Sequence, residues 1–177
     1  RTKWLLSTAA MVEGIMHLIS SNPQKDRDFL AMKRSLWSGT GTRSDLKKME
    51  SNGKRDTSVL RNMYIENKDE EIYEIIFRYF DAVNEILWKN ASADSVITKT
   101  IGISVLFDIL KTIIENEGIQ NSFEKYISLI SDVDYTSNYF SLSGGGKVKL
   151  RRILKYKLGF LKEADLVEAD IKFLQEQ

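Results

Sequence analysis

The sequence has no cysteine, a single proline and a single histidine. The lack of cysteine excludes a thiol nucleophile, a disulfide framework and thiolate metal sites, and it fits a reducing compartment. One proline, Pro23, is few for a loop-rich β protein and suits a helical one. No apolar run approaches the roughly 18 residues that span a bilayer, and Glu13 and His17 interrupt the N-terminal stretch that a signal peptide would need. We therefore expect a cytoplasmic protein with no membrane partner.

Catalytic constellations are also lacking. The chain has no cysteine that could bind a metal together with His17, and no glutamate lies at the spacing of H-E-x-x-H. A zinc site is therefore not expected. Helical RNases that pair an arginine with a following histidine need a basic residue shortly before it, and residues 7–16 contain none. The carboxylates at 69–71 and 163–170 fit helix electrostatics, because neither group has the convergent partner of a two-carboxylate catalyst or a Mg²⁺ site. The sequence predicts no enzyme, no metal and no cofactor.

Length and charge limit the remaining possibilities. With 177 residues, 42% hydrophobic and 29% charged, the chain is long enough for one domain with a real core. The net charge is +1, so nucleic acid would have to be bound by a local patch rather than by the chain as a whole. The sequence begins with Arg1 and not with methionine. We expect it to be a piece of a longer polypeptide.

Two segments have a clear helical period. From Lys68 to about Lys89, apolar residues recur at i, i+3, i+4 and i+7, and three acids lie in the first turn, where the helix dipole favours them. A second helix is predicted from about Thr98 or Thr100 to Asn116. Its N-terminal half is apolar almost all round, which indicates the central, most buried helix. Gly102 lies in that half, and we predict that it allows close packing against the helix at 68–89.

The whole chain, 1–177, is predicted to form one all-α domain of about five to seven helices. Residues 1–22 would hold the first helix. Residues 24–57 are expected to be the least regular part of the chain and partly mobile, because they are polar and carry both charge signs, with candidate short helices at 26–37 and from a cap at Ser44 to Met49. Residues 60–160 would form the helical core. Residues 161–177 would form a terminal helix.

The segment 143–157 reads SGGGKVKLRRILKYK and contains no acid. Glycine allows backbone N–H groups to approach a ligand closely, and a helix N-terminus presents unpaired N–H groups and a positive dipole end to an anion. The junction between the glycines and the basic helix is therefore a candidate phosphate contact. The predicted anion-binding residues are Ser143, Gly144, Gly145, Gly146, Lys147, Lys149, Arg151, Arg152 and Lys155.

Other interpretations of this segment stay open. The cations are equally typical of the solvated face of a surface helix. A nucleotide P-loop is excluded, because its first glycine would fall at Ser141 and its Ser or Thr at Val148. Among the aromatic residues that could stack on bases, Trp88 is expected to pack in the core. Trp37 and the tyrosines at 135 and 139 remain open between packing and stacking.

Three pieces of the chain together resemble one protein family. They are IYEIIFRYFDAVNEILW at 72–88, ITKTIGISVLFDILKTI at 97–113, and the Ser-Gly-Gly-Gly turn with its basic helix at 143–152. In this order and spacing they resemble the C-terminal helical half of DGQHR-domain proteins, over roughly residues 60–160. These bacterial proteins include the regulator encoded beside DNA phosphorothioation systems and relatives in other DNA-modification clusters. The Asp-Gly-Gln-His-Arg signature is absent here. In the family it belongs to an N-terminal α/β part, which would precede Arg1.

The resemblance implies a cytoplasmic protein that associates with DNA and acts in DNA modification, transcription regulation or phage defence. This chain would be its non-catalytic helical portion, with DNA and the absent N-terminal domain as partners. The alternative is a helical protein–protein interaction domain that couples the absent domain to a partner or forms a homo-oligomer. In that case the basic helix would meet an acidic surface.

Overall fold

The computed structural model describes residues 7–36, 41–51, 53 and 55–176, and within these residues all regular secondary structure is helical. The prediction of an all-α protein is confirmed. The described residues form nine α-helices, more than the sequence indicated, because several are only one or two turns long. The α-helices are α1 (Thr8–Ile19), α2 (Pro23–Leu36), α3 (Asp45–Ser51), α4 (Arg61–Ile65), α5 (Asp69–Val83), α6 (Thr100–Glu117), α7 (Glu124–Ser128), α8 (Gly144–Lys157) and α9 (Glu168–Gln175). None of the described helices is long and apolar enough to span a bilayer.

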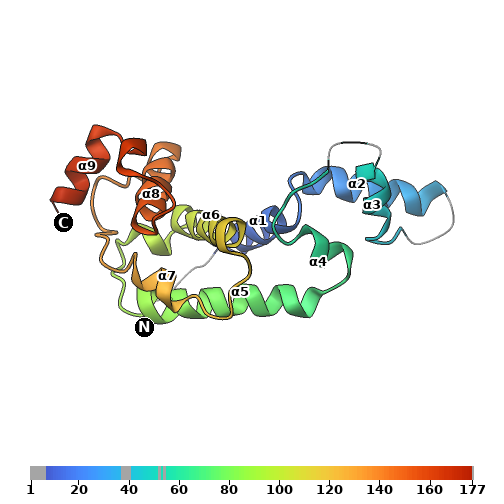
Figure 1. The fold of residues 1–177 in the computed structure, drawn as a ribbon, viewed down its shortest axis with the longest axis horizontal. Coiled ribbons are helices and arrows are strands. Elements are labelled where there is room, and N and C mark those ends of the chain that lie inside the picture. The colour runs from blue at the N-terminus through green and yellow to red at the C-terminus, as the bar shows by residue number, and fades with distance from the viewer. Residues whose placement is uncertain (1–6, 37–40, 52, 54, 177) are drawn as a thin grey trace.

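Helix α6 lies at the centre of the fold, as predicted. Its residues Ile103, Leu106, Leu110 and Ile113 are fully buried, and α1 and α8 both pack against it. The helix ends at Gly118, whose φ of 76° is accessible to glycine at no steric cost. Figure 1 shows α6 and α1 in the middle of an elongated molecule, with α8 and α9 at one end and α2 and α3 at the other.

Gly102 is buried, but its close neighbour is not the one that the sequence predicted. A Cβ atom at this position would lie 2.4 Å from the carbonyl oxygen of Val96 and 2.5 Å from Cα of Ile97. Both atoms belong to a 3₁₀ turn, Val96–Thr98, which leads into α6. The prediction of packing against α5 was wrong in its partner, because the chain folds back on itself just before the helix begins.

Helix α5 continues into a π-helical turn, Asn84–Trp88, so the helical segment ends within one residue of the predicted boundary. The turn brings Leu87 and Trp88 into the core, and the indole Nε1 of Trp88 donates a hydrogen bond to the carbonyl of Ile97, 3.1 Å away. The expectation that Trp88 packs in the core is confirmed. Tyr79 ties α5 to the central helix through a 2.8 Å bond from its hydroxyl to the carbonyl of Leu106.

The segment 24–57, expected to be irregular, contains most of α2 and all of α3. Arg61 holds these helices to the rest of the fold and is only 2% exposed. Its guanidinium donates hydrogen bonds to Asp26, to Glu50 at 2.7 Å and to the carbonyl of Ile19 at 3.3 Å. The ion-pair partners lie 35 and 11 residues away in sequence, so local patterns give no sign of them.

The C-terminal boundaries also differ from the prediction. Helix α8 begins at Gly144, so the glycines form its first turn and are not a loop before it. Residues 161–177 do not form one helix: a 3₁₀ turn, Glu163–Asp165, precedes α9. The break between them is fixed by Asp165 and Asp170, whose carboxylates accept the backbone N–H groups of Lys162 and Val167.

Candidate anion-binding site

The first turn of α8 divides the three glycines into two kinds. Ser143 is the N-cap, and its Oγ accepts the N–H of Gly146 at 3.3 Å. A Cβ at position 146 would lie 1.7 Å from the carbonyl oxygen of Ser141, so glycine is required there by packing. Gly144 and Gly145 are exposed, and no described residue accepts a hydrogen bond from their N–H groups. The N–H of Gly146, which the sequence placed among the anion-binding groups, is used by this cap.

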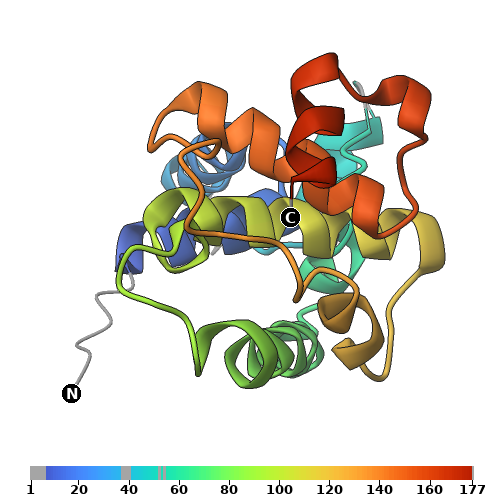
Figure 2. The same ribbon diagram turned by 90° about the vertical axis from the view of Figure 1, so that its left-hand side faces the viewer.

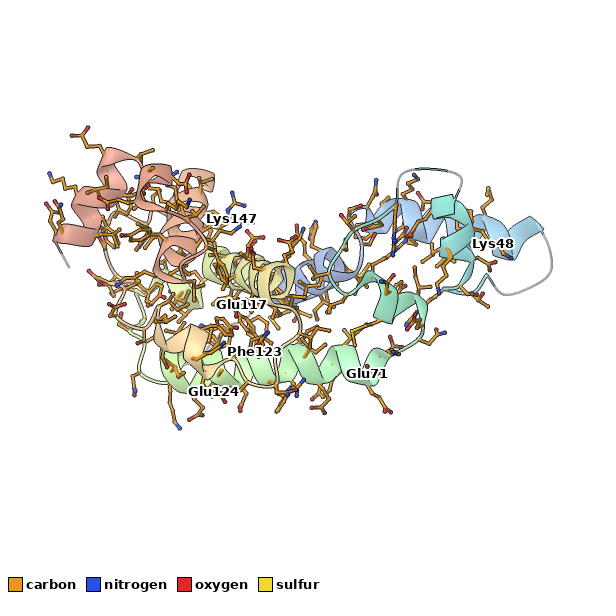
Figure 3. All side chains as sticks on the ribbon, in the orientation of Figure 1. Lys48, Glu71, Glu117, Phe123, Glu124 and Lys147 are labelled. Carbon is orange, nitrogen blue, oxygen red and sulfur yellow. The ribbon has the colours of Figure 1, made fainter. Side chains whose placement is uncertain are left out.

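Lys147 and Arg151 share one carboxylate on the central helix. Nζ of Lys147 donates to Oγ of Ser104 at 2.5 Å and lies 3.7 Å from Oδ2 of Asp108. A guanidinium nitrogen of Arg151 lies 3.4 Å from the same oxygen. All of these side chains are partly exposed to solvent, and Figure 3 shows Lys147 at the side of α8 that faces α6. Two cations against one carboxylate leave this surface positive.

Arg152 does not lie on the solvent face, where the sequence placed it. Its Nε and one terminal nitrogen donate to the two oxygens of Asp170, a residue of α9 that is 0% exposed. The carboxylate also accepts the hydroxyl of Tyr139 at 2.5 Å and the N–H of Val167 at 3.0 Å. Arg152 therefore holds α9 against α8 and is not available to an external anion.

Electrostatics of this cluster follow from its burial. Burial by itself raises the pKa of Asp170, but the hydrogen bonds from Arg152, Tyr139 and the Val167 N–H outweigh it and bring the pKa below its ordinary value. Burial and the bond to Asp170 raise the pKa of Tyr139 to about 12. The cluster is therefore a neutral tyrosine and an ion pair at physiological pH, as expected for a structural contact.

The remaining cations of α8 differ in their surroundings. Nζ of Lys149 lies 4.3 Å above the ring of Tyr139, and Nζ of Lys157 lies 2.5 Å from Oδ2 of Asp132. No described acid pairs with Lys155. Because Lys147, Arg151 and Lys155 follow each other at intervals of four residues, they form one row along the helix. We call these three residues the basic row.

The aromatic residues near the basic segment are used for packing. The ring of Tyr139 stacks on Phe173 with centroids 4.7 Å apart, and Tyr135 is buried with its hydroxyl bonded to the carbonyl of Ile130 at 2.7 Å. Burial raises the pKa of Tyr135 far above its ordinary value. Trp37 lies outside the described residues. Neither tyrosine is left with an open face for stacking on a base.

A cleft of about 490 Å³ lies between α1, α6 and α8, beside the basic row. It is lined by Lys147, by Ser104, Asp108 and Lys111 of α6, and by Glu13 and His17 of α1. His17 is exposed, and its Nδ1 lies 2.8 Å from the carbonyl oxygen of Glu13. No group of described His, Asp and Glu residues is arranged to hold a metal ion.

The contribution of α6 to this site was not predicted from the sequence. Ser104, Asp108 and Lys111 follow each other at intervals of four and three residues, so they form a polar stripe on an otherwise apolar helix. This polar stripe is the feature of the sequence from which the contribution of α6 could have been predicted. No protein-family model matches the chain, and searches of curated proteins and of solved structures found no significant similarity. The site therefore has to be interpreted from its own geometry, and the resemblance to DGQHR-domain proteins stays a prediction.

Proposed function

We propose that this chain is the non-catalytic helical portion of a cytoplasmic DNA-associated protein, and that the basic row binds the nucleic-acid backbone. The observation that carries the proposal is a charge imbalance on α8. Its six cations have three carboxylates as ion-pair partners, Asp108, Asp132 and Asp170, which leaves an excess of three positive charges. The exposed N–H groups of Gly144 and Gly145 lie at the N-terminal end of α8, the end that carries Lys147, and they add to the attraction for a phosphate.

The ion pairs already present do not prevent this binding. Exposed pairs of this kind contribute about 0–1 kcal/mol, so Lys147 and Arg151 can exchange Asp108 for a phosphate at little cost. Contacts of this type fix position on the backbone and carry no sequence information. A role in DNA modification, transcription regulation or phage defence, as the family resemblance implies, would place sequence or modification recognition in another part of the protein.

Arg151→Ala combined with Lys155→Ala tests the proposal. We expect the double variant to bind a fluorescein-labelled duplex more weakly, and the plot of log K against log salt to flatten by roughly two units, because two phosphate contacts are lost. Fluorescence anisotropy at several salt concentrations is the measurement. The charge-matched control is Arg27→Ala with Lys89→Ala, two exposed cations outside α8, and it should bind as the unaltered protein does.

Two results would contradict the proposal. One is an unaltered protein that binds no duplex at low salt. The other is a folded double variant whose affinity and salt slope equal those of the control. In either case the basic row is the solvated face of a surface helix, and the interaction-domain alternative becomes the better account of the chain.

A further inference from the structure

Helix α5 carries two aromatic side chains that the fold leaves uncovered. Tyr73 is 62% and Phe77 is 52% exposed, and their rings stack on each other with centroids 5.8 Å apart at an interplanar angle of 26°. Asp69 precedes Tyr73 by four residues, and Asp81 follows Phe77 by four residues. The four side chains therefore form one row along α5, with an acid at each end. Adjacent exposed aromatic rings on a surface helix are typical of an interaction site.

The aromatic pair forms one wall of a groove of about 540 Å³ between α5 and α1. The apolar lining consists of Met11 and Ile15 of α1 and of Ile72, Tyr73, Ile76, Phe77 and Phe80 of α5. Figure 2 shows α5 nearly end-on, with α7 covering one of its sides; the groove lies on the side toward α1. The described part of the chain supplies no segment that fills it.

The charge around this groove is negative. Asp69 and Asp81 are the only charged groups among its described lining residues. Along α5 as a whole there are five acids and one cation, Arg78. Asp69 has a partner in Arg43 at 2.5 Å, whereas no described cation pairs with Asp81. A nucleic acid would be repelled here, so this surface serves something other than the basic row.

We propose that the groove binds an amphipathic helix of a partner protein, with apolar anchors in its middle and Lys or Arg at both ends. Asp69 and Asp81 are 12 residues apart in the sequence, about 18 Å along the helix axis, which matches a helix of three to four turns. Leucine-type anchors at i, i+4 and i+7 would fill the space between the two helices, as in other helix-in-groove complexes. Cations at the two ends of the bound helix would reach Asp69 and Asp81.

A helix fits better than an extended peptide. Strand addition requires a sheet edge, and the described residues contain no strand. The basic helix of a second copy is also a poor occupant. Leu150, Ile153 and Leu154 of α8 are fully buried in its own fold and cannot enter a groove on another molecule. We therefore keep a helix of a partner protein as the proposed occupant.

The test uses two synthetic helices of about four turns, labelled with fluorescein. Both carry leucine at the a and d positions of a heptad pattern. One has lysine at each end, and the other has glutamate in the same places. We expect saturable binding of the lysine peptide, measured by anisotropy with the whole chain, and about tenfold weaker binding of the glutamate peptide because of the acids beside the groove. Amide NMR shifts that map to α5 and α1 should locate the bound peptide.

Variants make the test specific. Tyr73→Ala with Phe77→Ala should weaken binding of the lysine peptide by more than about tenfold, since aromatic anchors dominate such interfaces. Asp81→Asn should reduce the difference between the two peptides. The matched control is Ile119→Ala with Leu129→Ala, which removes two exposed apolar side chains outside the groove and should change neither affinity.

Several outcomes would overturn this proposal. The lysine peptide could show no saturable binding, or it could bind the aromatic double variant and the control equally well. Analytical ultracentrifugation could instead show a dimer that Phe77→Ala abolishes, which would assign the groove to a second copy of the chain. None of these outcomes depends on whether the basic row binds nucleic acid, so the two proposals can fail separately.

Discussion

Helices α8 and α5 are both long, amphipathic and rich in one sign of charge, yet they differ in how many of their charged and aromatic side chains the fold pairs or buries. On α8, four of the six cations pair with carboxylates of other segments, and one pair, Arg152 with Asp170, reaches a fully buried acid. On α5, the acids Glu70, Glu71 and Glu74 are exposed, and two aromatic rings face solvent. A charged run in a sequence can therefore take part in the packing of helices. An aromatic pair within a helical pattern can remain exposed to solvent.

The largest effect should come from the buried end of α8. Arg152→Ala leaves the carboxylate of Asp170 buried without its cation, and we expect the free energy of unfolding to fall by about 3 kcal/mol. Urea denaturation followed by circular dichroism is the measurement. Lys155→Ala is the control within the same helix, and it should change stability by less than about 0.5 kcal/mol. Equal, small effects of the two substitutions would mean that α9 is not held by this pair.

A second test compares two neighbouring glycines of α8. Gly146→Ala places a methyl group against the backbone of Ser141, which cannot move away without disturbing the cap, and should cost about 1–3 kcal/mol. Gly144→Ala meets no atom within 4 Å and should stabilise the helix by up to about 1 kcal/mol. Thermal melts of both variants would show the opposite signs. The same sign for both would contradict the described first turn.

Acid pH should weaken the contact between α8 and α9. The pKa of Asp170 is lower in the folded protein than its unfolded value of about 3.9. The ionised group therefore contributes stability above about pH 4, and this contribution is lost as the pH falls through the folded-state pKa. Urea midpoints measured between about pH 5 and pH 2.5 should decline, and Asp170→Asn should flatten that decline. An unchanged slope in the variant would show that Asp170 is not responsible.

The smallest effect is expected on α5. Phe77→Ser removes a large apolar side chain, but because that side chain is half exposed and lies outside the core we expect stability to change by less than about 0.5 kcal/mol. Thermal melting at several protein concentrations is the measurement. A loss above about 1 kcal/mol would show that the ring is covered in solution and would remove the contrast between the two helices.

Much of the fold was predictable because it depends on local period. The 3.6-residue pattern at 68–89 and the apolar run at 98–116 predicted α5 and α6 nearly to their ends. Elements of one or two turns, such as α4 and α7, are not delimited by the sequence, because so few residues show no clear helical period. Helix α2 was predicted only as a candidate short helix at 26–37, because its polar sequence folds against Arg61, a partner far away in the chain.

The candidate site was predictable only in part. The glycines and cations of 143–155 were found because they stand next to each other in the sequence. Their separate roles were not, since Arg152 meets Asp170 of α9 and Gly146 meets Ser141 only after the chain has folded. The contribution of Ser104, Asp108 and Lys111 required α6 and α8 to be side by side. The cleft that they line belongs to three helices and to no single motif.

The all-α class, the central helix and the position of the basic segment therefore follow from the sequence alone, because helix formation and charge density are local properties. The tertiary structure determines which cations form ion pairs with carboxylates of the same chain and which face solvent. It also determines that Tyr73 and Phe77 remain outside the core. The physical reason is the same in both cases. Burial and ion pairing depend on the distance between residues that are far apart in the chain, and that distance is set only by the packing of whole helices.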